Sequence, residues 1–379
     1  MTNELYKEEH HIFRESVRKF IASEVRPYFR DWEKDGSTPR ELWEKMGRQG
    51  FLVPWADERY GGFQADFLYD VILAEEFEKV ASGLGGTVLH NIIVVPYLYQ
   101  FGTEEQRMKW IPKCITGEYS TAVAMTEPGA GSDLAAIQTK AVRDGDDYII
   151  NGEKTFISNG RRADLVVVAC KTDAEAGHRG ISLIVVENGT PGFKRGKKLE
   201  KIGQLAAETC ELIFEDVRVP AANLLGEENK GFYYLMSKLQ QERLICSVQA
   251  LAAAEESLRI TVEYVKRRNA FGKTVGSFQN TQFKIAEMAT DIRMARSFIE
   301  DLIVRYMNKE DIGTQVTMAK WWTTDMAKRV VGQCMQLHGG YGFMEEYAIA
   351  RRYRDVAVMS IYAGSNEIMK QIISKNIGL

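Results

Sequence analysis

The stretch Lys238–Cys246, KLQQERLIC, lies in the longest helical pattern of the chain and sets how the C-terminal part folds. Apolar residues repeat through this pattern at steps of three, four or seven, which is the spacing of one buried face of a helix. These residues are Phe232, Leu235, Leu239, Cys246, Ala250 and Ala253. Glu242 falls in the same row, three residues after Leu239 and four before Cys246. A charged side chain on a buried face is costly unless it is paired, neutralised or used.

Two interpretations of Glu242 are open at this point. It is either a boundary residue in a surface ion pair with Lys238, one helical turn earlier, or a carboxylate that the buried face keeps for chemistry. Arg243 is not its obvious partner, because adjacent residues on a helix do not face each other.

The helical pattern continues from Glu242 to the end of the chain. Glycines separate the predicted helices, which run over about 231–268, 276–308, 312–338, 345–355 and 365–376. Several of these are long enough to form a helical bundle, so we predict a C-terminal four-helix-bundle domain over residues 229–379.

Upstream of this bundle the pattern changes to short β-branched runs bounded by turn dipeptides such as Asp144-Gly145 and Asn159-Gly160. The predicted strands are 120–126, 148–150, 164–170, 181–186 and 211–219. Because no helical pattern intervenes, the sequence favours an antiparallel β-barrel or sandwich over residues 120–228.

Residues 1–119 return to the helical period and predict an all-α N-terminal domain. Thr103 is a good helix start, since its hydroxyl can cap the helix and Gln106 follows three residues later. The chain is therefore expected to be an α+β protein with the order α, β, α.

Composition excludes several classes of protein. The 49 basic and 52 acidic residues give a net charge of -3, which offers no basis for nucleic-acid binding. None of the five cysteines has a CxxC or zinc-type spacing, the histidines form no metal site, and no apolar run could span a membrane. The N-terminus has no secretory signal, so we expect a cytoplasmic protein, with a processed mitochondrial-matrix form as the alternative.

Four motifs could contact a ligand, although each has a simpler structural explanation. Residues 126–133, TEPGAGSD, form a tight loop after a strand, and residues 156–160, FISNG, end another strand with an aromatic and a hydroxyl. Residues 267–273, RRNAFGK, place cations at a helix C-terminus, and residues 336–342, QLHGGYG, could be a helix cap. There is no Rossmann fingerprint or P-loop, so a dinucleotide would need another kind of site.

Taken in order, TEPGAGSD, FISNG, QQER, RRNAFGK, QLHGGYGF and IYAGSNEIM resemble the flavin-dependent acyl-CoA dehydrogenases over essentially the whole chain. Within that family the chain is most similar to the long-chain and isovaleryl-CoA type. The resemblance implies bound FAD, a homotetramer, an acyl-CoA substrate and electron-transfer flavoprotein as the electron acceptor.

The same resemblance assigns the cofactor residues. The flavin ring would be lined by Val123, Met125, Thr126, Gly131, Ser132, Phe156, Ile157 and Ser158. The adenine dinucleotide would be held across a subunit boundary by Arg268, Phe271, Gln279, Gln336, Leu337, His338, Gly339 and Gly340. Further flavin contacts would come from Ser365, Asn366 and Glu367.

In the family reaction an α-proton and a β-hydride leave the acyl-CoA, giving a trans-2-enoyl-CoA. Many members carry the base as a Glu in an IYEGT loop, but here that loop has Ala363, which cannot accept a proton. In the long-chain and isovaleryl enzymes the base is the Glu of a helical ER pair, which implies Glu242 as the catalytic base. Substrate contacts are implied for Ser132, His178, Arg179, Tyr233, Gln240, Gln241, Arg243, Tyr362, Ala363 and Gly364, with the Ala363 amide N–H as a hydrogen-bond donor to the thioester oxygen, which gains negative charge.

Two competing functions follow from the same residues. An acyl-CoA oxidase would pass the electrons to oxygen, although such enzymes are usually longer. A non-catalytic acyl-CoA-binding or assembly protein on this scaffold would explain the loss of the loop carboxylate at Ala363.

Overall fold

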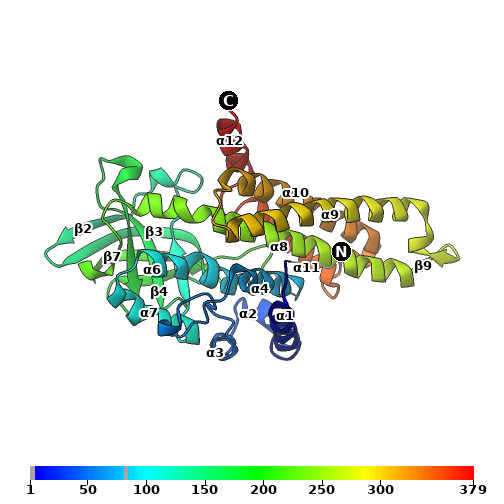
Figure 1. The fold of residues 1–379 in the computed structure, drawn as a ribbon, viewed down its shortest axis with the longest axis horizontal. Helices are drawn as coiled ribbons and strands as arrows, with labels where there is room; N and C mark the ends of the chain where they lie inside the picture. Colours follow the sequence, from blue (N-terminus) through cyan, green and yellow to red (C-terminus); the bar gives the residue numbers. More distant parts are fainter. Residues whose placement is uncertain (1–4, 81–83) are drawn as a thin grey trace.

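The computed structural model describes residues 5–80 and 84–379 and has a helical domain, a sheet domain and a helical bundle in that order (Figure 1). The predicted α, β, α architecture is confirmed. The N-terminal helices are α1 Glu8–Phe20, α2 Phe29–Asp35, α3 Arg40–Arg48, α4 Phe67–Val80, α5 Gly85–Val88, α6 Val95–Phe101 and α7 Glu104–Thr116.

The start of α7 forms the predicted cap. The Thr103 hydroxyl accepts a hydrogen bond from the Gln106 backbone N–H at 3.3 Å, and the Gln106 side chain accepts one from the Thr103 N–H at 2.9 Å. These two bonds satisfy backbone donors that the first helical turn leaves free. A wider, π-helical segment, Leu89–Val94, runs directly into α6.

The middle domain is an eight-stranded sheet in the order β6-β7-β3-β2-β4-β5-β8, with β1 paired to β4. Its strands are β1 Thr121–Ala124, β2 Lys140–Asp144, β3 Asp147–Ser158, β4 Leu165–Lys171, β5 Ile181–Glu187, β6 Phe193–Lys198, β7 Thr209–Pro220 and β8 Leu224–Leu225. The sheet is mixed and not purely antiparallel, because β1 lies parallel to β4. Strands β2 and β6 were not predicted, since they are largely polar and show little buried alternation.

Strand β3 contains a bulge at the FISNG motif. Its pairing with β7 shifts between Lys154 and Ile157, and the inserted residue Phe156 has a left-handed φ of 60°. A bulge re-aims the side chain that it carries. It leaves Phe156 exposed, Ile157 buried and Ser158 half-buried, so the in-out alternation holds from Phe156 to Ser158 and is broken instead at Lys154 and Thr155, which are both buried.

The C-terminal domain is built on three long helices that lie side by side (Figure 1). Its helices are α8 Gly231–Arg267, α9 Gln279–Met307, α10 Gly313–His338, α11 Ala348–Asp355 and α12 Asn366–Asn376. A short hairpin of β9 Asn269–Ala270 and β10 Lys273–Thr274 follows the end of α8. The helical ranges expected from the sequence are confirmed to within a few residues.

The core of the bundle is continuous with part of the N-terminal domain. Leu244, Ile245 and Val248 of α8 are fully buried in one cluster with residues of α4, α9 and α10. Each such side chain contributes roughly 1.5–3 kcal/mol on burial. Helix α8 is therefore packed on several sides along this segment, and Glu242 stands at its beginning.

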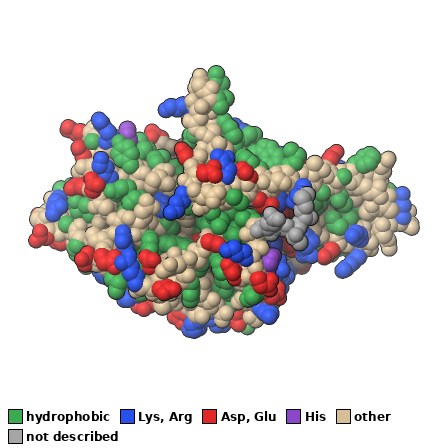
Figure 2. Space-filling model, in the orientation of Figure 1, with side chains coloured by type: hydrophobic (Ala, Val, Ile, Leu, Met, Phe, Trp, Pro, Cys, Tyr) green, Lys and Arg blue, Asp and Glu red, His purple; other side chains and the backbone are tan. Residues whose placement is uncertain are grey.

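The surface in Figure 2 carries acidic and basic side chains interspersed over the face in view. Within the two described ranges, no helix combines the length and the apolar character that crossing a bilayer requires.

Candidate active site

Glu242 is buried, with only 3% of its surface exposed. The Tyr97 hydroxyl on α6 donates a hydrogen bond to Glu242 Oε1 at 2.9 Å. Burial raises the pKa of Glu242 from 4.5 to about 7, and the Tyr97 bond offsets part of that rise. A carboxylate with a pKa near neutrality can both hold and release a proton at physiological pH.

The surface-pair interpretation of Glu242 is wrong. Among the described residues, no ion pair joins Glu242 to Lys238, whose ammonium instead lies 5.9 Å from the Phe101 ring centre. Burial lowers the pKa of Lys238, while the charge of Glu242 raises it. Tyr97 was not predicted as part of the site, because a tyrosine in the apolar run of α6 looks like an ordinary core residue.

Arg243 turns toward α10. Its Nη1 donates to Thr317 Oγ1 at 3.1 Å, and its buried Nε has no hydrogen-bond partner among the described residues. Burial is also the main cause that lowers the pKa of Arg243. A guanidinium with an unused N–H can still donate a hydrogen bond to a polar group of a ligand.

The loop that carries Ala363 lies against the same part of α8. Tyr362 packs on the bundle core, and burial, with a contribution from Cys246, raises its pKa. Cys246 is one turn beyond Glu242 on α8. Ala363 and Gly364 both have left-handed backbone conformations, with φ of 52° and 87°, and Ser365 caps α12 by accepting from the Ile368 N–H. The structure thus brings the Ala363 backbone close to the segment that carries Glu242.

The glycine-rich loop after β1 is anchored by a buried ion pair. Lys154 Nζ lies 2.7 Å from Glu127 Oε1 and also donates to the Met125 carbonyl at 3.0 Å. Glu127 accepts the Thr139 N–H as well. Beyond this anchor the loop is open: Ser132 is exposed, and the space beside Gly129 and Gly131 is empty. Val123, Met125, Thr126 and Ser158 are half-buried.

Six of the eight residues predicted to hold the adenine dinucleotide line a cavity of about 610 Å³. It is lined by Arg268, Gln336, Leu337, His338, Gly339 and Gly340. His338 is itself buried, stacks on Tyr264 at 4.3 Å and donates through Nδ1 to the Cys334 carbonyl at 2.8 Å. Phe271, at the tip of the hairpin, is 96% exposed, and Gln279 is also exposed.

Two groups of predicted substrate residues differ in their availability. His178 lies 6.5 Å from Tyr233 between ring centres, and both are exposed, as is Arg179. The side-chain amides of Gln240 and Gln241 are instead bonded within the protein. Gln241 donates to the Ile92 carbonyl and accepts from the Tyr306 hydroxyl, so its amide connects α8 to the Leu89–Val94 segment and to α9.

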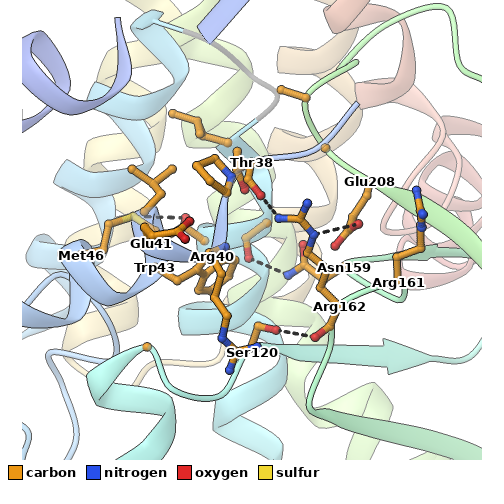
Figure 3. A pocket seen from close by; sticks show the side chains of 18 of the residues that line it. Thr38, Arg40, Glu41, Trp43, Met46, Ser120, Asn159, Arg161, Arg162 and Glu208 are labelled. Carbon is orange, nitrogen blue, oxygen red and sulfur yellow. Dashed lines mark hydrogen bonds and ion pairs between the residues drawn. The ribbon is translucent and has the colours of Figure 1, made fainter. Parts of the chain in front are cut away.

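A separate cavity of about 570 Å³ lies between α3 and the sheet domain, and none of the predicted site residues lines it. In Figure 3, Arg162 stands between Thr38 and Glu208. It donates to the Thr38 carbonyl, and its Nε is 3.6 Å from Glu208 Oε2. These contacts join the N-terminal and sheet domains, and we interpret this cavity as part of their junction.

The residues present fit a bound dinucleotide. Phe156, on its bulge, and Phe271 are large exposed aromatic side chains, 66% and 96% exposed, in two of the predicted cofactor motifs. Gly339 and Gly340 leave open space where a side chain would lie, so their backbone can approach a ligand. Aromatic faces, open backbone and the Arg268 guanidinium suit a flat, anionic cofactor.

The structure thus combines a buried carboxylate that can exchange a proton with an open glycine-rich loop on the neighbouring sheet, in the three-domain order that the sequence predicted for a flavin-dependent oxidoreductase. Family models for the N-terminal, middle and C-terminal domains of acyl-CoA dehydrogenase match residues 7–118, 122–217 and 229–378. The chain belongs to the acyl-CoA dehydrogenase family.

Individual relatives agree with this assignment. The chain is 48% identical to the mitochondrial long-chain specific acyl-CoA dehydrogenase of Rattus norvegicus over 98% of its length and 87% of the relative. It matches the crystal structure of an acyl-CoA dehydrogenase from Geobacillus kaustophilus with a TM-score of 0.98 at 60% identity, covering 100% of both chains. A glutaryl-CoA dehydrogenase from Mycobacterium smegmatis in complex with FADH2 matches with a TM-score of 0.93 at 28% identity, covering 100% of this chain and 96% of that one.

Proposed function

We propose that this chain catalyses the α,β-dehydrogenation of an acyl-CoA thioester to a trans-2-enoyl-CoA, and that Glu242 accepts the α-proton. FAD, when bound, supplies the acceptor for the β-hydrogen, which leaves as hydride. The proposal depends chiefly on one observation: Glu242 is buried, burial raises its pKa to about 7, and it lies one helical turn before Cys246, which is near Tyr362 in the loop where Ala363 has no carboxylate.

Three parts of the chain would contribute to proton removal. The buried position of Glu242 keeps water from competing for the base, and the Tyr97 hydroxyl holds one carboxylate oxygen. The thioester oxygen gains negative charge as the proton leaves, and the Ala363 N–H is our candidate donor to it. Arg243, with an unused Nε, is our candidate for a polar contact along the substrate path.

FAD would be held by two sets of residues. The loop from Thr126 to Ser132 and the strand end Phe156–Ser158 would surround the flavin. Within this set, Ile157 would contribute through its backbone, because its side chain is buried. Arg268 with residues 336–340 would hold the adenine dinucleotide.

The end of α8 that carries Arg268 is remote from Glu242 on the same helix, which supports a homo-oligomer, and we propose the homotetramer that the family resemblance implies. Arg268 lies about 39 Å from Glu242 along α8, at 1.5 Å per residue. A neighbouring subunit would therefore bring its Arg268 and Phe271 to each flavin. Sedimentation of the FAD-loaded protein tests this, and a monomer that retains FAD would contradict it.

The catalytic assignment is tested with Glu242→Gln, which keeps the shape of the side chain and removes its basicity. We expect turnover to fall roughly 10²-fold or more while FAD stays bound. Glu256→Gln is the matched control, because Glu256 lies on the same helix and is half-buried in an ion pair with the exposed Arg259. The assay is anaerobic bleaching of the flavin by acyl-CoAs of four to sixteen carbons and by isovaleryl-CoA. Near-normal bleaching by Glu242→Gln would show that the base lies elsewhere.

We propose electron-transfer flavoprotein as the electron acceptor. Parallel measurement of its reduction and of peroxide release separates this from the oxidase alternative. Protein that is yellow but is bleached by none of the acyl-CoAs would instead favour a non-catalytic binding function.

A further inference from the structure

Lys320 on α10 is a lysine whose surroundings call for explanation. Its side chain is fully buried, yet among the described residues it forms no ion pair with a carboxylate. A buried ammonium without a paired anion is costly, because Coulombic attraction to a partner does not offset the free energy lost on dehydration. Lys320 is also absent from every motif that the sequence singled out.

The ammonium of Lys320 is bonded to the loop that carries Ala363. Lys320 Nζ donates to the Gly364 carbonyl at 2.7 Å and to Asn366 Oδ1 at 3.2 Å. Two of its three donors therefore hold neutral oxygens on either side of Ser365. The contact joins the middle of a long, well-packed helix to a short loop.

Asn366 extends the same attachment. It is 3% exposed, and its amide nitrogen donates to the Thr324 hydroxyl at 3.0 Å and to Asp325 Oδ1 at 2.9 Å. The loop is thus tied to α10 at two points, through Gly364 and through Asn366. Its backbone needs such support, because Ala363 carries a Cβ in the left-handed region at a cost of about 1 kcal/mol or more.

The surrounding charges place Lys320 near the proposed chemistry. Its environment includes Arg243 and Cys246 of α8, Asp325 of its own helix and Glu367 of α12. Burial lowers the pKa of Lys320 to about 8, so most of it is charged at neutral pH. A fixed cation beside the loop would also favour negative charge there.

We propose that Lys320 is a positioning residue: by holding Gly364 and Asn366, it orients the Ala363 N–H toward the oxygen of the deprotonated thioester. This inference rests on the proposed function and names the residue that makes a loop without its own carboxylate effective as an oxyanion site. Lys320 acts through Ala363 and need not touch substrate.

The test separates stabilisation of the anion from folding and binding. A 3-thia-acyl-CoA has an acidified α-carbon and a sulfur in place of the β-carbon, so proton loss can occur but dehydrogenation cannot. The pH midpoint of its ionisation on the FAD-loaded enzyme, followed by absorbance, measures how well the site stabilises the enolate. For Lys320→Met we expect this midpoint to rise by about 1–2 pH units, which is a roughly 10–100-fold weaker ionisation of the bound analogue. This effect is smaller than that of deleting an oxyanion donor outright. FAD content, KM and affinity for a saturated, non-ionising CoA thioether should change little, while kcat falls.

Lys328→Met is the matched control, because Lys328 is an exposed lysine of the same helix that donates to Ser360 at 3.2 Å. An unchanged midpoint in Lys320→Met, or an equal rise in Lys328→Met, would overturn the inference. If Lys320→Met does not retain FAD, Lys320→Gln, which is shorter and uncharged, takes its place, and an unshifted midpoint there overturns the inference equally.

The outcome for the wild-type enzyme keeps the two proposals apart. If the wild type neither bleaches with acyl-CoA nor ionises the thia analogue, the proposed function fails. If the wild type does both and Lys320→Met behaves like it, only the role of Lys320 fails.

Discussion

The hydrogen bond from Tyr97 to Glu242 makes a quantitative prediction about the pH dependence of catalysis. A donor to a carboxylate stabilises the anion, so this bond holds the pKa of Glu242 below the value that burial alone would give. Tyr97→Phe removes the hydroxyl and keeps the ring. Hydrogen bonds to charged groups are worth about 1.5–3 kcal/mol, and 1.36 kcal/mol corresponds to one pKa unit. The pKa of Glu242 should therefore rise from about 7 by roughly 1–2 units.

The direction of the effect on rate follows from the role of the base. Proton removal requires ionised Glu242, so kcat/KM rises with pH through the pKa of the free enzyme. In Tyr97→Phe this rising limb should move to higher pH. At pH 7 the ionised fraction, and with it kcat/KM, should fall roughly 5–50-fold, and the two enzymes should converge at high pH.

The matched control is Tyr99→Phe, two residues along the same helix. Tyr99 donates to Asp57 Oδ2 at 2.6 Å and does not contact Glu242. Its variant should leave the rising limb in place. A Tyr97→Phe profile that is lowered uniformly without a shift, or that shifts to lower pH, would refute the reasoning.

Two further predictions concern stability. Burial raises the pKa of Asp70 from 3.8 to about 7. The contribution of the protonated Asp70 to the free energy of unfolding is therefore fully present below pH 3.8 and is lost as pH rises through 7. Asp70→Asn, which is neutral at every pH, should raise the free energy of unfolding at pH 8 by up to about 4 kcal/mol and change it little at pH 4, as measured by urea titration. Equal effects at both pH values would contradict this. Lys154→Met leaves Glu127 buried without its cation and should cost about 3–5 kcal/mol, whereas Lys194→Met, which breaks an exposed pair with Glu215, should cost under about 1 kcal/mol. Similar melting temperatures for these two variants would show that the buried pair does not anchor the loop as inferred.

The sequence predicted the helices well, because their apolar period is a local property that each segment carries by itself. Glu242 stood out for the same reason, because a carboxylate in an apolar row is visible without knowing what faces it, but the pattern left its role open and only the family resemblance, with Ala363 in the loop, implied it as the base. Its neighbours could not be identified in this way. Tyr97 and Lys320 are distant in sequence, and only packing brings Tyr97 to Glu242 or Lys320 to Gly364.

The sheet shows the same limit. The β-branched strands were predicted, but the parallel pairing of β1 with β4 and the bulge at Phe156 depend on a partner strand. The assignments of Gln240 and Gln241 to substrate illustrate the converse. The resemblance implied that both contact substrate, which stays a prediction, while in the structure the Gln240 amide is bonded to the connection between α9 and α10 and the Gln241 amide to the Leu89–Val94 segment and to α9.

The location of Glu242 on α8 has a consequence for how such an enzyme can diversify. A base on a loop places two requirements on one short segment, since that loop must both carry the proton acceptor and donate the hydrogen bond that stabilises the charged oxygen of the substrate. Here the proposed proton acceptor is positioned by the backbone of a 37-residue helix, and the proposed N–H donor to the charged oxygen lies on a separate loop. Either element can then mutate, within its own packing constraints, without displacing the other. The basicity of Glu242 and the stabilisation of the substrate anion become traits that selection can adjust one at a time.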